Sequence, residues 1–405
     1  MKITGRHLLV LIGMCGLLAS GVGLVTNVAG LFLSPIAEEF GILSGAASLT
    51  MTVCNVSFAI GGLFAPRFLK EGSFKATLIA GTAILAGATA ALSLCPSIMP
   101  IYVLCVARGL AAGTLGFVFV TSVLNQWFVS GVGLATSIAM ACSGLAGAAF
   151  SPIVGAVVSG AGWRAGYILL AVLTVALNLP AILFLPSLDP RSSGFQALGA
   201  DEAPAPPAEP QQGSAAAPAR PIKPLVFAAV FAFGVFASAV TALPQHFPTL
   251  AELYGLAGTG ATMLSVCMVA NSLGKIVFGA LVDKLGNRTS TIIYSGIILG
   301  AMAILLVLRV PGAMVVAAMM YGLCYALGTV SGTMLTRDAF GLENYGKVYP
   351  VVSLAGAMSN AVFSSVIGFM YDFSGGYAST IIMLAAMVGA GIAITVYVYA
   401  VSKEA

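Results

Sequence analysis

The most telling property of the sequence is how little charge it contains. Of 405 residues only 7% are Asp, Glu, Lys or Arg, whereas 59% are hydrophobic. Ordinary soluble domains have about 25% charged residues. So few charges cannot give a globule of this size a water-facing surface, and a disordered chain would need the opposite composition. The composition therefore predicts a polytopic membrane protein whose outer surface contacts the lipid bilayer.

Residues suited to metal binding or disulfide formation are also scarce. His7 and His246 are the only histidines, and no two of the seven cysteines have C-x-x-C spacing. This excludes a histidine metal cluster and argues against a zinc site or a disulfide framework. We expect no metal and no cofactor, and no nucleophile–base set indicates an enzyme. The small net charge of +4 gives no indication of nucleic-acid binding.

Long uncharged runs indicate helices that cross a membrane. The first run, from Leu8 to Leu33, has 26 residues without a charge, longer than the 7–15 apolar residues of a signal peptide. A spanning helix needs about 20 apolar residues, and these runs do not alternate as barrel strands do. The sequence predicts twelve helices, near 8–33, 45–66, 75–95, 100–123, 132–158, 164–186, 224–246, 259–282, 290–308, 312–336, 348–371 and 377–400.

One segment differs from the rest of the chain. Residues 189–224 are rich in Pro, Ala, Ser and Gln without apolar periodicity, which predicts a flexible linker. It separates an N-terminal six-helix bundle, residues 1–188, from a C-terminal six-helix bundle, residues 225–405. Two similar segments 217 residues apart, GLFAPR and GALVDK, indicate pseudo-symmetric bundles related by an axis along the membrane normal. The predicted fold class is thus an all-α membrane protein.

Lys and Arg residues are unevenly distributed between the two sides of this predicted topology. With the N-terminus inside, thirteen fall on one side, whereas only Arg164 and Arg309 fall on the other. Cytoplasmic loops have the excess of positive residues. We therefore expect a multi-pass protein of the cytoplasmic (plasma) membrane with both termini and the linker in the cytoplasm.

Charges within the predicted spans are all positive. None of the thirteen carboxylates lies mid-span, whereas Arg108 and Lys275 do. Each costs about 2.5–3.5 kcal/mol on insertion scales. Their helices belong to opposite halves, between which substrate sites near the midplane are formed. We expect a cavity of positive potential for an organic anion. Two alternatives to substrate binding stay open. Arg108 could bond backbone carbonyls of neighbouring helices, and Lys275 could extend its side chain to the membrane interface.

Several uncharged polar residues are further candidates for substrate contact. Tyr321 and Tyr325 are four residues apart and share one helix face, and His246 stands between two prolines near a predicted helix end. Asn27 and Asn271 are polar and membrane-embedded. Each of these residues also has a structural alternative. The tyrosines could serve packing, the histidine could lie at the membrane interface, and the asparagines could form helix–helix hydrogen bonds.

Two motifs resemble the major facilitator superfamily. Residues 279–289, GALVDKLGNRT, resemble the signature of its loop between helices 8 and 9, although the first-half copy has Pro66 where an acidic residue is usual. Residues 108–113, RGLAAG, resemble its helix 4 arginine motif, and the glycines and proline of residues 144–155 resemble its helix 5 pattern.

Shorter stretches suggest a narrower resemblance, to the monocarboxylate porter group and its bacterial oxalate:formate antiporter-like branch. These stretches are residues 126–128, 133–136, 162–164, 243–247, 271–275 and 343–346. The chain departs from that group in three places. It has no basic residues directly after Phe128, it has Lys275 where arginine is usual, and it lacks a second lysine within 348–371. A substrate with one carboxylate is therefore favoured over a dicarboxylate.

The resemblance implies a secondary transporter that works by alternating access as a monomer. Its substrate would be a small monocarboxylate-like anion, moved with protons or in exchange for a counter-anion. The second-half signature implies a cytoplasmic conformational gate, formed by Gly279, Asp283, Lys284, Gly286 and Arg288. A drug or metabolite efflux transporter of the same superfamily, and a nutrient sensor without transport, are the alternatives.

Overall fold

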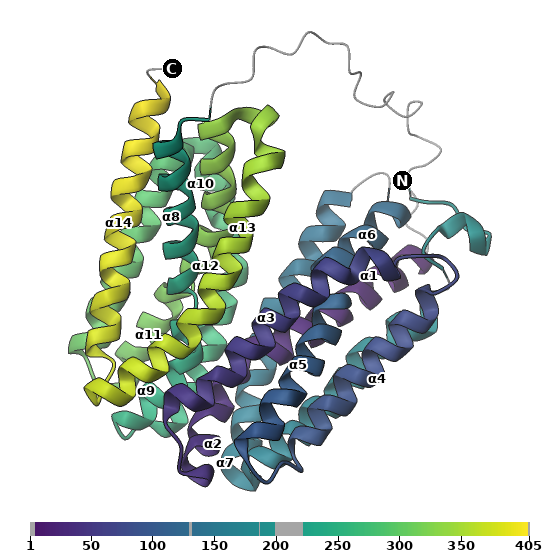
Figure 1. Cartoon of the computed structure of the whole chain (residues 1–405), viewed down its shortest axis with the longest axis horizontal. Coiled ribbons are helices and arrows are strands. Elements are labelled where there is room, and N and C mark those ends of the chain that lie inside the picture. Colours follow the sequence, from purple (N-terminus) through teal and green to yellow (C-terminus); the bar gives the residue numbers. More distant parts are fainter. Residues whose placement is uncertain (1–4, 129–131, 186, 199–221, 404–405) are drawn as a thin grey trace. The chain divides into compact units, whose positions relative to one another are not determined.

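The protein is built from long apolar helices (Figure 1). The computed structural model describes residues 5–128, 132–185, 187–198 and 222–403. Within these ranges ten helices are long and apolar enough to cross a membrane. Two of the ten have 50 residues each, about 75 Å at 1.5 Å per residue, which is more than twice the thickness of a hydrocarbon core. The all-helical membrane fold is confirmed, and the count of twelve spans stays a prediction.

Three helices contain a single glycine whose backbone is not helical. These are Gly162 in α7, Gly286 in α10 and Gly341 in α13, with φ of 84°, 78° and 70°. Positive φ is readily available only to glycine. The sequence places loops at these same positions, between the spans predicted on either side. The bounds of these helices are Val132–Phe184 for α7, Ala257–Val307 for α10 and Gly332–Ser374 for α13.

The chain divides into two compact units. Unit 1 comprises Met1–Ala29 and Val53–Ala216, and unit 2 comprises Gly30–Thr52 and Ala217–Ala405. Helix α3 (Ser44–Phe68) therefore begins in unit 2 and continues into unit 1. The predicted domain boundaries at 188 and 225 stay predictions, and residues 199–221 of the predicted linker lie outside the described residues.

Unit 1 contains α1, the π-helical segment η1, α4, α5, α6 and α7. Apart from α7, their bounds are Gly5–Leu18, Ala19–Asn27, Phe74–Leu92, Ile98–Thr114 and Phe117–Trp127. A core of buried residues on α1, α4, α6 and α7 includes Trp127, Phe119 and Phe74, and the last two rings are stacked 5.4 Å apart. The predicted helices 8–33 and 100–123 are thus interrupted, the first by π and 3-10 turns and the second at residues 115 and 116.

The segment that follows α7 packs against the core of unit 1. Leu198 pairs with Phe128 in an isolated bridge, and its N–H donates to the Trp127 carbonyl at 2.9 Å. Nε2 of His7 lies 3.1 Å from the Gln196 carbonyl. Residues 189–198, the start of the predicted linker, thus have a defined position on this bundle.

Unit 2 contains the short helix α2, the start of α3, and α8 to α14. Apart from α10 and α13, the bounds are Leu33–Phe40 for α2, Pro224–Val240 for α8, Phe247–Leu253 for α9, Pro311–Tyr321 for α11, Cys324–Ala326 for α12 and Ala378–Lys403 for α14. A 3-10 turn (Leu243–His246) follows α8, and a π-helical segment (Leu327–Ser331) follows α12. The predicted helices 224–246 and 312–336 are therefore not continuous.

The close contact between α3 and α5 in unit 1 requires a glycine at position 113. A Cβ added there would collide with the backbone carbonyl of Phe58 on α3, whereas a Cβ at Gly87 on α4 would meet nothing within 4 Å. We expect Gly113→Ala to destabilise the protein by about 1–3 kcal/mol through overpacking. Thermal unfolding in detergent, followed by protein fluorescence, measures this.

Gly87→Ala is the matched control for that substitution. Helix propensity favours alanine over glycine by about 1 kcal/mol, so this variant should unfold at the wild-type temperature or above it. Equal unfolding temperatures for the two variants would contradict the close contact between α3 and α5.

Candidate substrate site

Arg108 lies on α5 and is almost fully buried, with 4% of its surface exposed. One terminal nitrogen of its guanidinium donates to the Leu24 carbonyl at 3.4 Å, and its Cζ lies 5.7 Å from the centre of the Tyr167 ring. Its Nε has no hydrogen-bond partner among the described residues. The guanidinium has five N–H donors, so most of its hydrogen-bonding capacity is not used by these contacts.

Asn27 ends the π-helical segment η1 in the same unit. Its side chain is buried and donates to the Ser143 carbonyl on α7 at 3.0 Å. This is the helix–helix hydrogen bond that the sequence left open as an alternative. A substrate contact by Asn27 stays a prediction.

Lys275 lies on α10 in unit 2 and is half-buried. Its Nζ lies 5.9 Å from the centre of the Tyr325 ring, at the outer range of a cation–π contact. Among the described residues no salt bridge is found between a carboxylate and either Lys275 or Arg108. Both predicted cations are therefore without an acidic partner there.

Asn271 precedes Lys275 by one helical turn, so the two side chains share a face of α10. Its amide is buried, its Nδ2 contacts only the Met268 sulfur at 3.9 Å, and its Oδ1 has no partner among the described residues. A buried polar group without a partner is destabilising by about 1–3 kcal/mol. Asn271 is thus a group whose hydrogen bonds the described structure does not supply.

Tyr321 and Tyr325 donate to the backbone where α8 ends. Pro244 has no N–H and cannot donate to the Val240 carbonyl four residues before it, and the Tyr321 hydroxyl donates to that carbonyl at 2.8 Å. The Gln245 N–H bonds Ala242 instead, and the Thr241 carbonyl accepts from Tyr325 at 3.4 Å. The two tyrosines thus satisfy carbonyls freed by the proline break, and their roles in substrate binding stay predictions.

His246 is buried in the 3-10 turn after α8, with 1% of its surface exposed. Its Nε2 lies 2.9 Å from the Ser364 carbonyl, and its Nδ1 lies 3.3 Å from the Tyr377 hydroxyl. A neutral ring that donates from Nε2 and accepts at Nδ1 satisfies both contacts. The histidine therefore ties the turn to α13 and to Tyr377, the residue before α14, and its role in substrate contact stays a prediction.

The predicted conformational gate surrounds the break in α10. Gly286 provides the non-helical backbone, Gly279 is half-buried, and the side chains of Asp283, Lys284 and Arg288 are exposed. The described residues supply no ion pair for Asp283. The gating role of these five residues stays a prediction.

The structure adds Asn287, which sequence reasoning did not single out. Its buried side chain donates to the Ser331 carbonyl at 3.3 Å and to the Tyr399 hydroxyl at 3.1 Å, and Tyr399 donates to Asp338. Asn287 thus ties the gate segment to the π-helical turn before α13 and to α14. Asn287 lies within the signature of residues 279–289, which could have indicated a role for it. Its partners could not be predicted, because they lie 44 and 112 residues away in the sequence.

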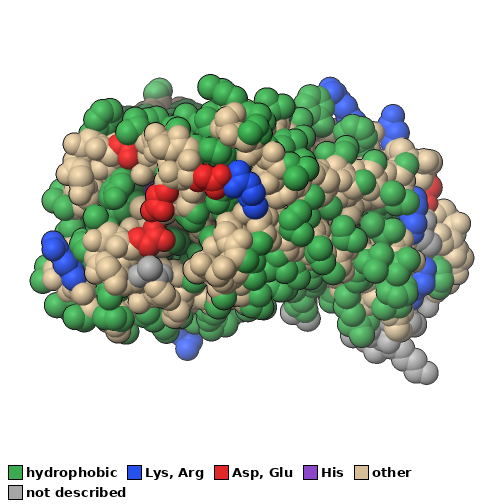
Figure 2. Space-filling view, turned by 90° about the horizontal axis from the view of Figure 1, so that it is seen from below, with side chains coloured by type: hydrophobic (Ala, Val, Ile, Leu, Met, Phe, Trp, Pro, Cys, Tyr) green, Lys and Arg blue, Asp and Glu red, His purple; other side chains and the backbone are tan. Residues whose placement is uncertain are grey.

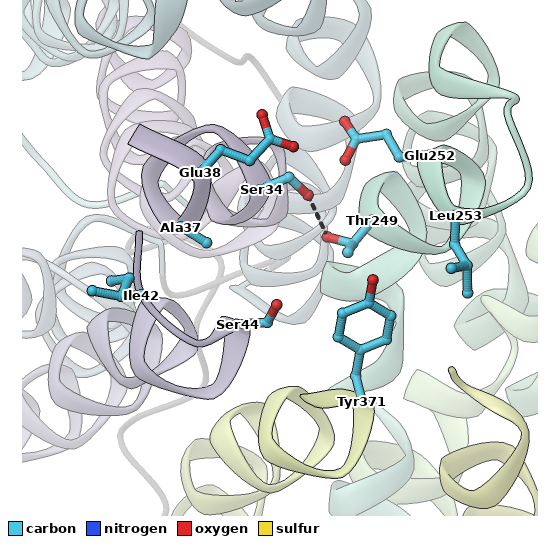
Figure 3. A pocket seen from close by; sticks show the side chains of 9 residues that line it. All are labelled: Ser34, Ala37, Glu38, Ile42, Ser44, Thr249, Glu252, Leu253 and Tyr371. Carbon is cyan, nitrogen blue, oxygen red and sulfur yellow. Dashed lines mark hydrogen bonds between the residues drawn. The ribbon is translucent and has the colours of Figure 1, made fainter. Parts of the chain in front are cut away.

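A cavity of about 360 Å³ in unit 2 also escaped the sequence reasoning. Figure 3 shows Ser34, Glu38, Thr249, Glu252 and Tyr371 among the side chains that line it. It is formed by α2, the start of α3, α9 and α13. Two carboxylates and no basic residue line this cavity, so it is a poor site for an anion.

The structure suggests a test of the Tyr321 contact. Tyr321→Phe leaves the Val240 carbonyl without a donor, and we expect a loss of about 1–3 kcal/mol in stability. Pro244→Ala restores an N–H at the position from which a helix would donate. In the double variant we expect the loss from Tyr321→Phe to shrink, as measured by a thermal-unfolding cycle of the four proteins.

Strictly additive losses in that cycle would show that the hydroxyl does not replace the missing N–H. Tyr397→Phe on α14 is a matched control, because the Tyr397 side chain is exposed.

Comparison with known families gives a match along most of the chain. A family model described as the Major Facilitator Superfamily matches residues 14–308 and 247–405. The chain is 30% identical over 235 residues to the "MFS-type transporter pytF" of Aspergillus terreus, a match that covers 56% of this chain and 72% of that relative.

Solved transporter structures have the same fold. The nucleoside transporter NupG, in a mutant form, matches with a TM-score of 0.68 at 13% identity, over 98% of this chain and 99% of that chain. A bacterial homolog of the human lysosomal transporter Spinster, in an inward-facing and unoccupied conformation, matches with a TM-score of 0.64 at 13% identity, over 99% and 96%. At such low identity these two likenesses concern the fold alone.

Proposed function

Because the chain belongs to the major facilitator superfamily of transporters, we propose that it moves a small monocarboxylate-like organic anion across the cytoplasmic membrane by alternating access. The excess of Lys and Arg in alternate loops supports an orientation with both termini in the cytoplasm. The observation that carries the proposal is the pair of intramembrane cations, Arg108 and Lys275, for which the described residues supply no carboxylate.

Arg108 supports the proposal through the donors that it has left. A buried guanidinium that contacts one carbonyl at 3.4 Å and one aromatic ring has N–H groups available. The charge remains uncompensated in a region of low dielectric, where an anion is strongly attracted. Its role is to provide positive potential, and a direct bond to the substrate is not needed for that role.

Lys275 is the residue that we assign to the substrate carboxylate. It is half-buried, so its ammonium group is neither sealed in the core nor held by an acidic side chain of the described chain. Asn271, one turn away, supplies an amide whose oxygen has no partner there. The lysine pairs with the carboxylate, and the amide binds a polar group beside it.

The mode of energy coupling follows from which groups can carry a proton. No carboxylate lies mid-span in the sequence, and both ring nitrogens of His246 are engaged with Ser364 and Tyr377. A proton relay through His246 would have to break these contacts. The arrangement supports exchange of one anion for another, or symport in which the substrate or Lys275 carries the proton.

Uptake into proteoliposomes tests the assignment of Lys275. Lys275→Gln removes the charge that pairs with the carboxylate, and such charge-assisted hydrogen bonds contribute about 1.5–3 kcal/mol. We expect the apparent affinity for the preferred labelled monocarboxylate to fall roughly 10–150-fold. The panel contains monocarboxylates, dicarboxylates, amino acids and organic cations, with the internal anion and the pH gradient varied separately.

Two variants control this experiment. Lys275→Arg keeps the charge and should retain transport, whereas Lys223→Gln removes a charge from an exposed position outside the spans and should leave uptake unchanged. Unaltered uptake by Lys275→Gln, or a preference of the wild-type protein for cations, would rule out the proposed site.

A further inference from the structure

Two basic side chains of unit 1 lie where apolar spans begin. Arg6 is the second residue of the candidate span Gly5–Asn27, and Lys75 is the second residue of the candidate span Phe74–Leu92. The ends of spanning helices lie at the level of the lipid headgroups. Figure 2 shows Lys and Arg side chains along the right-hand edge of the molecule, beside hydrophobic side chains. The two cations are thus placed at the boundary between membrane and water.

The packing of α1 on α7 brings Arg6 to the end of α7. A Cβ at Gly16 would collide with the Leu177 carbonyl. A Cβ at Gly13, one turn earlier on α1, would lie 2.9 Å from the Ala181 Cα, one turn later on α7. The two helices are therefore antiparallel and in close contact. Two further turns of α1 lead from Gly13 to Arg6, which places this residue beside the end of α7.

Lys75 reaches the same end of α7 from α4. Its ammonium group donates to the Ile182 carbonyl and, at 3.0 Å, to the Leu185 carbonyl. Carbonyls at the end of a helix have no donor within the helix, and the lysine supplies one. The charges of Arg6 and Lys75 are close enough to repel each other. Two cations from different helices thus meet where α7 ends.

The guanidinium of Arg6 has hydrogen-bonding capacity left for a ligand. Its Cζ lies 4.9 Å from the centre of the Phe195 ring, a cation–π contact. Its Nε is buried and has no hydrogen-bond partner among the described residues. A guanidinium has five N–H donors in a planar fork that matches the oxygens of a phosphate group. An oxyanion would therefore supply what this side chain lacks.

Two acidic side chains at this end of unit 1 have other partners. Glu71 accepts hydrogen bonds from the Asp189 N–H at 3.1 Å and from the Ser192 hydroxyl. The Asp189 carboxylate forms a salt bridge with Arg191. Within the described ranges neither of the two cations forms a salt bridge with a carboxylate. Their charges therefore attract an anion from outside this part of the chain.

Exposed apolar side chains continue from the two cations along the spans. Ile79 follows Lys75 by one turn of α4, Leu8 follows Arg6 on α1, and both are exposed. Leu183, near the end of α7, is exposed as well. Such side chains favour hydrocarbon over water. A phospholipid matches this surface better than free phosphate does, because its phosphate and its acyl chains are joined.

We propose that Arg6 and Lys75 bind the phosphate group of an anionic phospholipid where α1, α4 and α7 meet. The Arg6 guanidinium donates to two phosphate oxygens, and Lys75 adds its charge and its third N–H. Basic pockets between spanning helices bind such headgroups on the cytoplasmic side, and the charge pattern of the loops predicts that side for this end. The site depends on neither the identity of the cargo nor its direction of transport.

Lipid titration in detergent, followed by native mass spectrometry, measures the dissociation constant of the first bound lipid. The probes are phosphatidylglycerol, which is anionic, and phosphatidylcholine, whose phosphate charge is balanced by choline. We expect the wild-type protein to bind phosphatidylglycerol roughly 10-fold more tightly than phosphatidylcholine. Arg6→Gln should weaken phosphatidylglycerol binding roughly 10-fold, since charge-assisted hydrogen bonds to phosphate are lost, and should leave phosphatidylcholine binding unchanged.

Lys70→Gln is the matched control. Lys70 is exposed in the loop before α4, so this variant removes one positive charge from the same end of unit 1 and should keep the wild-type affinity. Arg6→Lys keeps the charge without the planar fork and should retain part of the affinity. Lys75→Gln provides a second variant if Arg6→Gln does not fold, and unfolding temperatures without lipid identify any variant that is destabilised throughout.

Inorganic phosphate and glycerol 3-phosphate test whether the phosphate group comes from water instead of the membrane. Neither should displace phosphatidylglycerol from the wild-type protein, and binding of either one as tight as that of the lipid would overturn the lipid assignment. The site itself would be overturned if neither Arg6→Gln nor Lys75→Gln weakened phosphatidylglycerol binding. An equal loss in Lys70→Gln would overturn it too, because the effect would then be one of net charge.

Discussion

The architecture of this protein depends on one constraint: polar groups surrounded by lipid must find their partners inside the protein. With 59% hydrophobic residues, the chain has few side chains to spare for this purpose. It uses them where helices break, as the Tyr321 hydroxyl does for the Val240 carbonyl and the Asn287 amide does for the Ser331 carbonyl. Each of these irregular turns of backbone is paired with a side chain from another helix, so the breaks are fixed features of the fold.

The same constraint gives meaning to the groups that are left incompletely satisfied. Arg108 and Asn271 each have a buried polar atom without a partner among the described residues, and Lys275 has an aromatic ring nearby and no carboxylate there. These side chains are costly where they lie, and a cargo that supplies negative charge and hydrogen bonds would reduce that cost. Tyr321 and His246 differ from them, because both already have hydrogen-bond partners within the protein. The buried polar residues are thus of two kinds, those that stabilise breaks in the helices and those whose hydrogen bonds are incomplete.

Much of the fold could be predicted from the sequence, because lipid imposes long apolar runs. The predicted loops coincide with the non-helical backbone of Gly162, Gly286 and Gly341, since charge and glycine mark those places locally. The interruption of the predicted helix 224–246 could also have been anticipated, as Pro244 removes a helical donor. The hydrogen bonds between Asp372 and the start of α3 could not be predicted, because these residues are 327 and 328 positions apart in the sequence. The partners of Asn287 could not be predicted either, since they lie 44 and 112 positions away. Periodicity and composition indicate which face of a helix is apolar, but they do not indicate which distant helix it meets.

Helix α3 has a mechanical consequence because it belongs to both units. Between Ala46 and Ile60 it contains neither glycine nor proline, and sharp bends in helices occur almost only at such residues or at inserted turns. The helix therefore lacks a flexible joint where it passes from one unit to the other at Thr52 and Val53. Its first two turns in unit 2 are therefore continuous with the part of the helix that belongs to unit 1.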